Sequence, residues 1–486
     1  MKKILLFITV CLLFSSCEKQ NIEQQSEIII TIDDESIQHV EVYRSEKGIS
    51  LWSNKKDSLI KTKKNQFVLN FSAKELQYAR LKVGEKWGII IIIPGQKYQV
   101  HFTKNTKEFS LDNAKGQEVL NSFDRIPAQT FVFLNRFKKD STAQLVSEKI
   151  HAFKNKEFSK IDSLLKENQI DKSFYAFLKK EIDYYYAAAT ISVSDYKSEQ
   201  KNASKKAFND LSIKTINLYP YDKSNLIPPS WSEYTMSSQI TRTVINEYSQ
   251  EVRNKLYKKD SIHFLYTNTI KKKLEEPFRE RLIAQYIINS AKQKKYEKSL
   301  ITIFDDFQKA YPESSFIEYL KDDISTIREY QKKIALELPE NVIIIEDKNL
   351  NTFEDLLAQL KGQKLYVDMW ATWCGPCKVE FGESDKIKTT LKKNGYKKLY
   401  ISVDRASAYD KWIEMIKYYD LSGYHHLANK TFFKHFSENY TTAQKGSLLL
   451  PQYLLIEKDG TITTKNAPRP SQHKKLEKVL DSLSKL

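Results

Sequence analysis

The chain has 486 residues, of which 41% are hydrophobic and 12% aromatic. This composition can bury apolar cores and the length suggests about two to four domains, so an intrinsically disordered chain is excluded. The chain carries 78 basic and 61 acidic residues and a formal net charge of +17. Because no module combining aromatic and basic residues stands out, we expect no nucleic-acid partner and interpret the charge as solvated surface.

The N-terminus has the pattern of an export signal. Two lysines precede an apolar run over residues 4–14, which is too short to span a bilayer. Small residues follow directly before Cys17, an arrangement that resembles a bacterial lipobox with Phe14 where an aliphatic residue is usual. We predict a signal peptide over residues 1–16 and a lipid on Cys17 that anchors the chain to a membrane on the periplasmic side of a bacterial envelope. Which membrane is left open, and ordinary cleavage with an unmodified Cys17 is the alternative.

The cysteine count sharpens this prediction. The chain contains Cys11, Cys17, Cys374 and Cys377. Cys11 leaves with the signal peptide and Cys17 carries the lipid, so the exported chain keeps one pair. In a compartment where disulfides persist, we expect this pair to serve thiol-disulfide exchange while the cores hold the fold.

Residues 17–112 are predicted to form a small β-sandwich-like domain. Gln66–Phe71 and Lys97–Phe102 alternate apolar and polar residues, as half-buried strands do. Ile89–Ile93 is a run of isoleucines closed by Pro94-Gly95, which is typical of a strand buried on both faces and followed by a turn. The pattern loosely resembles the N-terminal domain of many lipoproteins from Bacteroidetes-type bacteria.

Residues 113–334 are predicted to be an all-α helical domain. Apolar residues over 300–307 and over 317–327 follow helical spacing, and Tyr311-Pro312 breaks the chain between them. This predicts a helical hairpin and resembles the tetratricopeptide-like hairpins that precede some redox domains. The region shows no clean repeat period and no catalytic motif.

Residues 335–486 hold the candidate chemistry. We expect a lead-in strand and helix over residues 338–360. A strand over Leu365–Met369 then runs into Cys374-Gly-Pro-Cys377, and a helix continues to about Lys393. The remaining expected elements are a strand over 398–403, a crossover helix over 406–421, a strand and turn over 451–460, a pairing strand over 461–464 and a closing helix over 471–486.

A C-x-x-C motif between a strand and a helix has a specific chemical use. The sulfur of Cys374 is expected at the helix N-terminus, where unpaired N–H groups and the macrodipole favour a thiolate. The spacing lets Cys377 lie one turn behind and close a disulfide, and Pro376 suits the first helical turn. Such motifs lower the thiol pKa below the free value of about 8.5. A structural disulfide or half a zinc site is the alternative, but zinc normally has four ligands and the chain has no second cysteine pair.

These residues resemble the active site of the thioredoxin superfamily. Trp373-Cys-Gly-Pro-Cys377 matches its motif, Asp368 stands six residues before Cys374 as its buried acid does, and Trp370 matches its first tryptophan. The resemblance implies an α/β thioredoxin-like fold for residues 335–486.

Within this superfamily the chain resembles the TlpA/ResA-like envelope oxidoreductases. Glu380 matches the acid that follows their motif, and Pro451 matches their cis-proline before a strand that ends at Asp459-Gly460. The segment 468–471 resembles the Bacteroidetes branch. Gly382 departs from the family, which usually has proline there, and we expect a changed helix bend.

The resemblance also implies roles for the residues. Cys374 attacks a substrate disulfide and passes through a mixed disulfide, Cys377 resolves it, and Asp368 takes the proton of Cys377 with help from Glu380. It implies protein thiols and disulfides and an upstream envelope electron donor as partners, without a cofactor or metal. The residues expected to face the substrate are Trp373, Gly375, Pro376, Leu450 and Pro451.

The expected function is therefore an envelope thiol-disulfide oxidoreductase. The dipeptide Gly375-Pro376 lacks the histidine of oxidising relatives, so a reductant is expected. The alternative is an envelope binding or scaffold lipoprotein with an auxiliary redox domain. A peroxiredoxin is disfavoured because Ala371 stands where that family needs threonine. His425 and His426 are interpreted as part of a loop, since two adjacent histidines without other ligands do not make a metal site.

Overall fold

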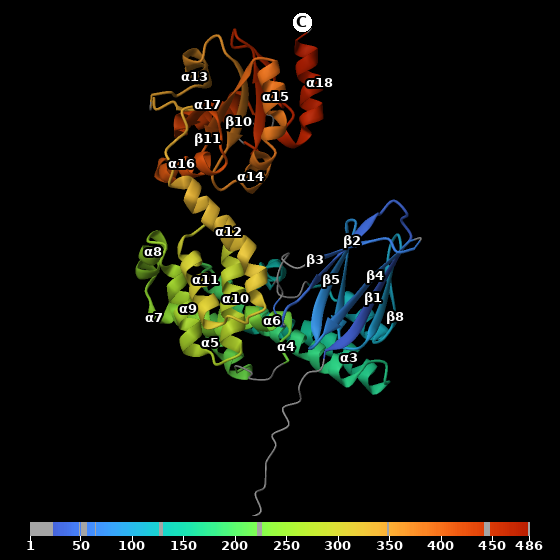
Figure 1. The fold of residues 1–486 in the computed structure, drawn as a ribbon. Helices are drawn as coiled ribbons and strands as arrows, with labels where there is room; N and C mark the ends of the chain where they lie inside the picture. The colour runs from blue at the N-terminus through green and yellow to red at the C-terminus, as the bar shows by residue number, and fades with distance from the viewer. Residues whose placement is uncertain are drawn as a thin grey trace, which may run out of the picture. The chain divides into compact units, whose positions relative to one another are not determined.

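The computed structural model contains two compact units, one up to Ser325 and one from Thr326 to Leu486 (Figure 1). The predicted signal peptide and Cys17 lie outside the residues that the structure describes. Among the described helices, none is both long and apolar enough to cross a membrane. The structure describes residues 23–47, 49, 56–63, 65–125, 130–220, 226–347, 349–441 and 448–484.

The first unit begins with two four-stranded sheets that share one core. Alternate side chains point inward, as Ile28, Val42 and Phe67 do, and each of these is fully buried. One sheet has the order β4-β1-β7-β8 and the other β3-β2-β5-β6. The strands are β1 Gln24–Ile32, β2 His39–Arg44, β3 Lys56–Ile60, β4 Gln66–Ala73, β5 Gln77–Val83, β6 Lys86–Ile92, β7 Lys97–Phe102 and β8 Lys107–Leu111.

Ile89–Ile92 of the isoleucine run lie on β6, and Ile90, Ile91 and Ile92 are fully buried, so the strand is buried on both faces, as its sequence predicts. Ile90 and Ile92 belong to the core between the sheets, whereas Ile91 belongs to the core of the helical region. The two regions therefore pack as one compact unit, although the sequence suggests a separate domain on each side of residue 112.

Helix α1, Ala114–Asn121, completes the hydrogen bonding of β6, which is an edge strand. The Gln117 side chain accepts from Ile91 N at 3.0 Å and donates to Ile91 O at 2.7 Å. The Asn121 side chain makes the same pair of bonds with Ile89, at 3.0 and 2.7 Å. Spaced four residues apart, these two amides lie on one face of the helix and take the place of a neighbouring strand.

The rest of the first unit is helical. Its described helices are α2 Thr130–Phe133, α3 Ala143–Lys166, α4 Lys172–Ser198, α5 Lys205–Leu218, α6 Pro229–Thr235, α7 Arg242–Glu247, α8 Gln250–Lys258, α9 Ile262–Lys273, α10 Phe278–Ala291 and α11 Ser299–Ala310. The predicted hairpin is formed by α11 and α12, Phe316–Ile334. The division between the units falls within α12, and the sequence places it at the end of this helix. The last turns of α12 belong to the second unit, where Lys333 pairs with Asp420 at 2.7 Å.

The second unit is built on a six-stranded sheet with the order β14-β13-β10-β11-β12-β9. Strands β9, β12, β11 and β10 run parallel, and β13 pairs antiparallel with both β10 and β14. The carboxyl ends of four strands therefore meet at one edge of the sheet. The strands are β9 Val342–Ile344, β10 Lys364–Trp370, β11 Tyr396–Ser402, β12 Gly423–Leu427, β13 Gln452–Ile456 and β14 Ile462–Thr464.

Helices cover both faces of this sheet. Helices α13, Phe353–Gln359, and α17, Lys430–Asn439, pack on one apolar face, while α15, Asp385–Lys393, and α18, His473–Leu483, pack on the other. Two sequence expectations were wrong. The helix after the cysteines ends at Gly382 as α14 and restarts as α15, and the histidine pair lies on strand β12, which together with α17 was not predicted.

Candidate active site

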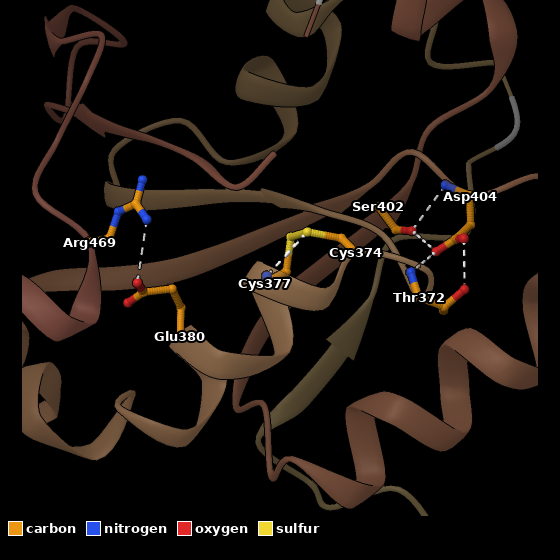
Figure 2. Close-up of a disulfide and its surroundings, with 7 residues drawn as sticks. All are labelled: Thr372, Cys374, Cys377, Glu380, Ser402, Asp404 and Arg469. Carbon is orange, nitrogen blue, oxygen red and sulfur yellow. Dashed lines mark hydrogen bonds and ion pairs between the residues drawn. A yellow bond between two sulfur atoms is a disulfide. The ribbon is translucent and has the colours of Figure 1, made fainter. Parts of the chain in front are cut away.

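The two cysteines lie at the connection between β10 and the helix that follows it, α14, Gly375–Gly382. Cys374 is the N-cap residue of that helix, and its Sγ accepts a hydrogen bond from Cys377 N at 3.1 Å. The two residues form a disulfide with their Cα atoms 5.4 Å apart (Figure 2). Cys374 is 4% exposed and Cys377 is fully buried. Only Cys374 can meet a partner from outside, so it suits the attacking sulfur and Cys377 the resolving one.

The residues predicted to face the substrate flank Cys374 in the chain or come directly before β13, the strand that pairs with β10. The Leu450–Pro451 peptide is cis, and Pro451 directly precedes β13, which pairs Gln452 with Met369 near the carboxyl end of β10. Trp373 is 69% exposed and Leu449 is 73% exposed. Pro376 occupies the first turn of α14. Apart from the chain neighbours of Gly375 and the backbone of its own helix, no atom of the described residues lies within 4 Å of the position that a Cβ on Gly375 would take. An exposed tryptophan thus lies directly before Cys374 in the chain, and an exposed leucine lies directly before the cis Leu450–Pro451 peptide. Trp370, by contrast, is fully buried and packs on Phe381.

Asp368 is a buried acid on β10. It is 3% exposed, and its Oδ1 reaches no hydrogen-bond partner in the described part of the chain. Burial raises the pKa of Asp368 to about 8, with Lys398 acting against this rise and Glu380 adding to it. Burial also lowers the pKa of Lys398 to about 8, while Asp368 acts against that shift. Near neutral pH this carboxyl can therefore bind or release a proton.

Lys398 was missed in the sequence reading. It lies on β11, where Tyr366 pairs with Lys398 and Asp368 pairs with Tyr400. Because side chains alternate along a strand, Lys398 and Asp368 share one face of the sheet. The sequence signal for Lys398 was a lysine that directly precedes the apolar residues of a predicted strand. Only the register between β10 and β11 shows that it faces Asp368.

Glu380 lies on α14, and both of its oxygens are occupied. Its Oε2 accepts from Ser471 N and its Oε1 from Ser471 Oγ, each at 2.9 Å, and Arg469 Nη1 stands 3.6 Å from Oε1. These contacts tie α14 to the segment just before α18. Glu380 is therefore a tether between two segments, and its share in proton transfer stays a prediction.

On the other side of the disulfide, Asp404 holds the loop that leads into Cys374 (Figure 2). Its Oδ2 accepts from Thr372 N at 2.7 Å and from Ser402 Oγ at 2.7 Å, and its Oδ1 accepts from Thr372 Oγ1 at 2.8 Å. Asp404 is 4% exposed. Sequence reasoning missed this residue, although β10 and β11 were both expected and residues that follow neighbouring parallel strands meet at one edge.

His425, the first histidine of the pair, has a structural role. His425 donates from Nε2 to Leu421 O at 2.7 Å and stacks on Tyr400 with ring centroids 4.8 Å apart. Burial lowers the pKa of His425 to about 4, so this ring is neutral at physiological pH. Within the described ranges, no group of three or more histidine, cysteine or acidic side chains could hold a metal ion.

Comparisons with known proteins match a family model within this unit and relatives over a quarter to about half of the chain. Residues 336–480 match the Redoxin family model. The thiol-disulfide oxidoreductase ResA of Bacillus cereus is 24% identical over an alignment of 143 residues, which covers 27% of this chain and 69% of that protein. A solution structure from Bacteroides vulgatus, assigned as a thiol-disulfide oxidoreductase, is 31% identical over 26% of this chain and 78% of its own, with a TM-score of 0.22. A thioredoxin-like protein from Bacteroides caccae is 12% identical over 54% of this chain and 97% of its own, with a TM-score of 0.20.

Proposed function

Since the C-terminal unit of this chain belongs to the thioredoxin superfamily, as a TlpA/ResA-like thiol-disulfide oxidoreductase, we propose that the protein reduces disulfides of other proteins in a bacterial cell envelope. The observation that carries this proposal is the asymmetry of the cysteine pair. Cys374 caps a helix and touches solvent, whereas Cys377 is fully buried behind it.

The reaction starts from the reduced pair. The Cys374 thiolate attacks one sulfur of the substrate disulfide, an S–S bond forms between enzyme and substrate, and the second substrate sulfur leaves as a thiolate that takes up a proton. Cys377 loses its proton and attacks Cys374 Sγ, which releases the first substrate sulfur. Two electrons pass to the substrate and the pair ends as the disulfide seen here. An envelope electron donor must then restore the dithiol.

We assign the proton of Cys377 to Asp368. A buried thiol resists ionisation because its thiolate is poorly solvated, so the resolving step needs a base inside the protein. Asp368 is buried, keeps one oxygen without a partner in the described residues, and has a pKa raised to about 8. A carboxyl with this pKa is ionised in a fraction of the molecules near neutral pH, and in that fraction it can accept the proton of Cys377 and return it later.

The surroundings of Cys374 favour a protein substrate. Trp373 and Leu449 are large, apolar and mostly exposed, and such side chains are suited to contact another polypeptide. The test is reduction of insulin disulfides by the full-length chain with dithiothreitol as electron donor. We expect acceleration that is lost in Cys374→Ser. If the chain reduces hydroxyethyl disulfide but no protein disulfide, the proposed substrate class is wrong.

The direction of electron flow has its own test. We expect a reduction potential nearer to that of thioredoxin, about −270 mV, than to the strongly oxidising value of about −120 mV. Equilibration of the full-length chain with glutathione measures it. A value above about −180 mV would make the protein an oxidant or isomerase.

Anchoring in the envelope is part of the proposal. It is supported by the apolar run before Cys17 and the small residues that precede this cysteine. We expect mass spectrometry of the mature protein to find a diacylated Cys17 at its N-terminus. An unmodified N-terminus, or a form released by osmotic shock, would contradict the anchor.

A binding or scaffold role is the second candidate, because the Redoxin match begins at residue 336 and leaves the first unit, up to Ser325, without an assigned activity. The full-length double variant Cys374→Ser/Cys377→Ser separates the two functions. If it supports the cell as well as the native chain does, the first unit carries the main function. Loss of function in this variant favours the oxidoreductase.

A further inference from the structure

A cleft of about 1240 Å³ opens at the edge of the sheet that also carries the disulfide. It is lined by residues that end or follow strands β9, β11 and β12, and by the first turns of α16, Tyr409–Tyr418, and α17. In α/β sheets, ligands bind outside the carboxyl ends of the parallel strands. The cleft has this position, but Cys374 and Pro451 do not line it.

The cleft is joined to the catalytic loop through one residue. Asp404 lines the cleft and also accepts both hydrogen bonds from Thr372, two residues before Cys374. The pairing of Trp370 with Ser402 shows that β10 and β11 end side by side. A chain bound with its sulfur at Cys374 can therefore continue into the cleft along the same edge.

Aromatic rings form the walls and floor. Tyr409 is 41% exposed and Phe433 is half-buried, whereas Trp412 and His426 are almost fully buried. The walls thus suit the faces of another aromatic ring.

The rim and the size indicate a polypeptide. Two cations, Arg405 and Lys430, share the rim with two acids, Glu346 and Asp347. A phosphate or another polyanion would meet repulsion from the acids, whereas a peptide with mixed charges is compatible with both signs. The volume also exceeds the range of about 300–1,000 Å³ that is usual for small-molecule pockets.

We propose that this cleft binds a segment of the substrate protein beside its reactive cysteine and receives an aromatic side chain. The inference rests on the proposed function, because a protein disulfide must first reach Cys374. Neighbouring strands are about 4.8 Å apart, so a site over β11, β12 and β9 lies roughly 5–14 Å to the side of β10. An extended chain advances about 3.3 Å per residue, which places the aromatic residue about two to four positions from the substrate cysteine.

The test uses short peptides whose single cysteine is held as a mixed disulfide with thionitrobenzoate. The reduced full-length chain supplies two electrons and releases peptide thiol and coloured thionitrobenzoate. With phenylalanine about two to four positions from the cysteine, we expect kcat/KM to be about tenfold higher than with serine there. With phenylalanine about eight positions away, we expect no advantage.

Variants of the cleft should remove this preference. In Tyr409→Ala and Phe433→Ala, the ratio of kcat/KM for the phenylalanine peptide to that for the serine peptide should fall toward one. Leu336→Ala is the matched control, since this leucine is 62% exposed and does not line the cleft. It should keep the native ratio.

Two outcomes overturn the inference: native protein that shows no preference for phenylalanine, or cleft variants that keep the preference. Hydroxyethyl disulfide separates this failure from that of the proposed function. If the native chain reduces it but ignores the aromatic residue, the oxidoreductase stands and the cleft assignment falls. If the native chain reduces neither, the proposed function itself fails.

Discussion

Two buried aspartates flank the disulfide, and they differ in what surrounds their carboxyl groups. Asp368 on β10 has an oxygen without a hydrogen-bond partner among the described residues, and its pKa is raised to about 8. Asp404, just after β11, receives two hydrogen bonds from Thr372 and one from Ser402. They are 3% and 4% exposed. The two aspartates are equally buried, but the carboxyl oxygens of Asp404 are engaged in holding a loop, whereas Asp368 keeps one oxygen without a partner in the described residues and is suited to move a proton.

The largest expected difference concerns stability and pH. The folded-state pKa of Asp368 is raised from 3.8 to about 8. Below about pH 4 both the folded and the unfolded state hold this proton. As the pH rises from 4 to 8 only the unfolded state releases it, so the free energy of unfolding falls over this window. Asparagine does not titrate, so the free energy of unfolding of Asp368→Asn does not fall in this way. The variant should be more stable than the native oxidised chain by several kcal/mol at pH 8. Urea unfolding at pH 4, 6 and 8 measures the difference, which should be smallest at pH 4; a difference independent of pH would contradict the raised pKa.

The same substitution should slow catalysis. Asp368→Asn keeps the shape but removes the base, so resolution of the mixed disulfide should slow roughly 10²-fold while the first attack changes little. Stopped-flow kinetics at neutral pH separates the two steps. If the variant resolves at the native rate, Asp368 has only a structural role.

Asp404→Asn should lower the stability of the fold and leave the proton transfer of the resolving step unchanged. One amide oxygen replaces two acceptor atoms, and the amide N–H₂ meets groups that donate to the native carboxylate. We expect a loss of about 1–3 kcal/mol in the free energy of unfolding, with no new pH dependence of the resolving step. Thermal unfolding together with the pH profile of turnover checks both parts. A change in the pH profile would mean that Asp404 shares the proton route.

Glu380→Gln should have the smallest effect on resolution, a few-fold, because Ser471 and Arg469 already engage its carboxylate. If Glu380 and Asp368 share one proton route, the double variant should lose less than the product of the single losses. Losses that multiply would mean that the two acids act independently and would favour Glu380 as a tether.

The strand and helix order around the cysteines could be predicted because it follows from local pattern. The run of apolar residues before Cys374 predicts β10, and Pro451 precedes an apolar strand. The partners of Glu380 could not be read, since Ser471 lies 91 residues away. Strand β12 was missed because it is short and contains two histidines, which count as polar in sequence but are buried here. The roles of Asp404 and Lys398 could not be predicted, because their neighbours follow from the register between β10 and β11.

The side-chain amides of α1 that pair with β6 bear on how the molecule can be divided. A fragment that stops at residue 112 would contain every strand of the two sheets but neither Gln117 nor Asn121. Its isoleucine strand would then present unpaired N–H and C=O groups along a free edge, with Ile91 uncovered on the outer face. Such an edge is a template for strand addition from another copy, and a five-residue isoleucine run without charge has the composition of aggregating segments. During synthesis β6 also emerges before α1, so the same segment stays open to misassembly until residues 114–121 have followed.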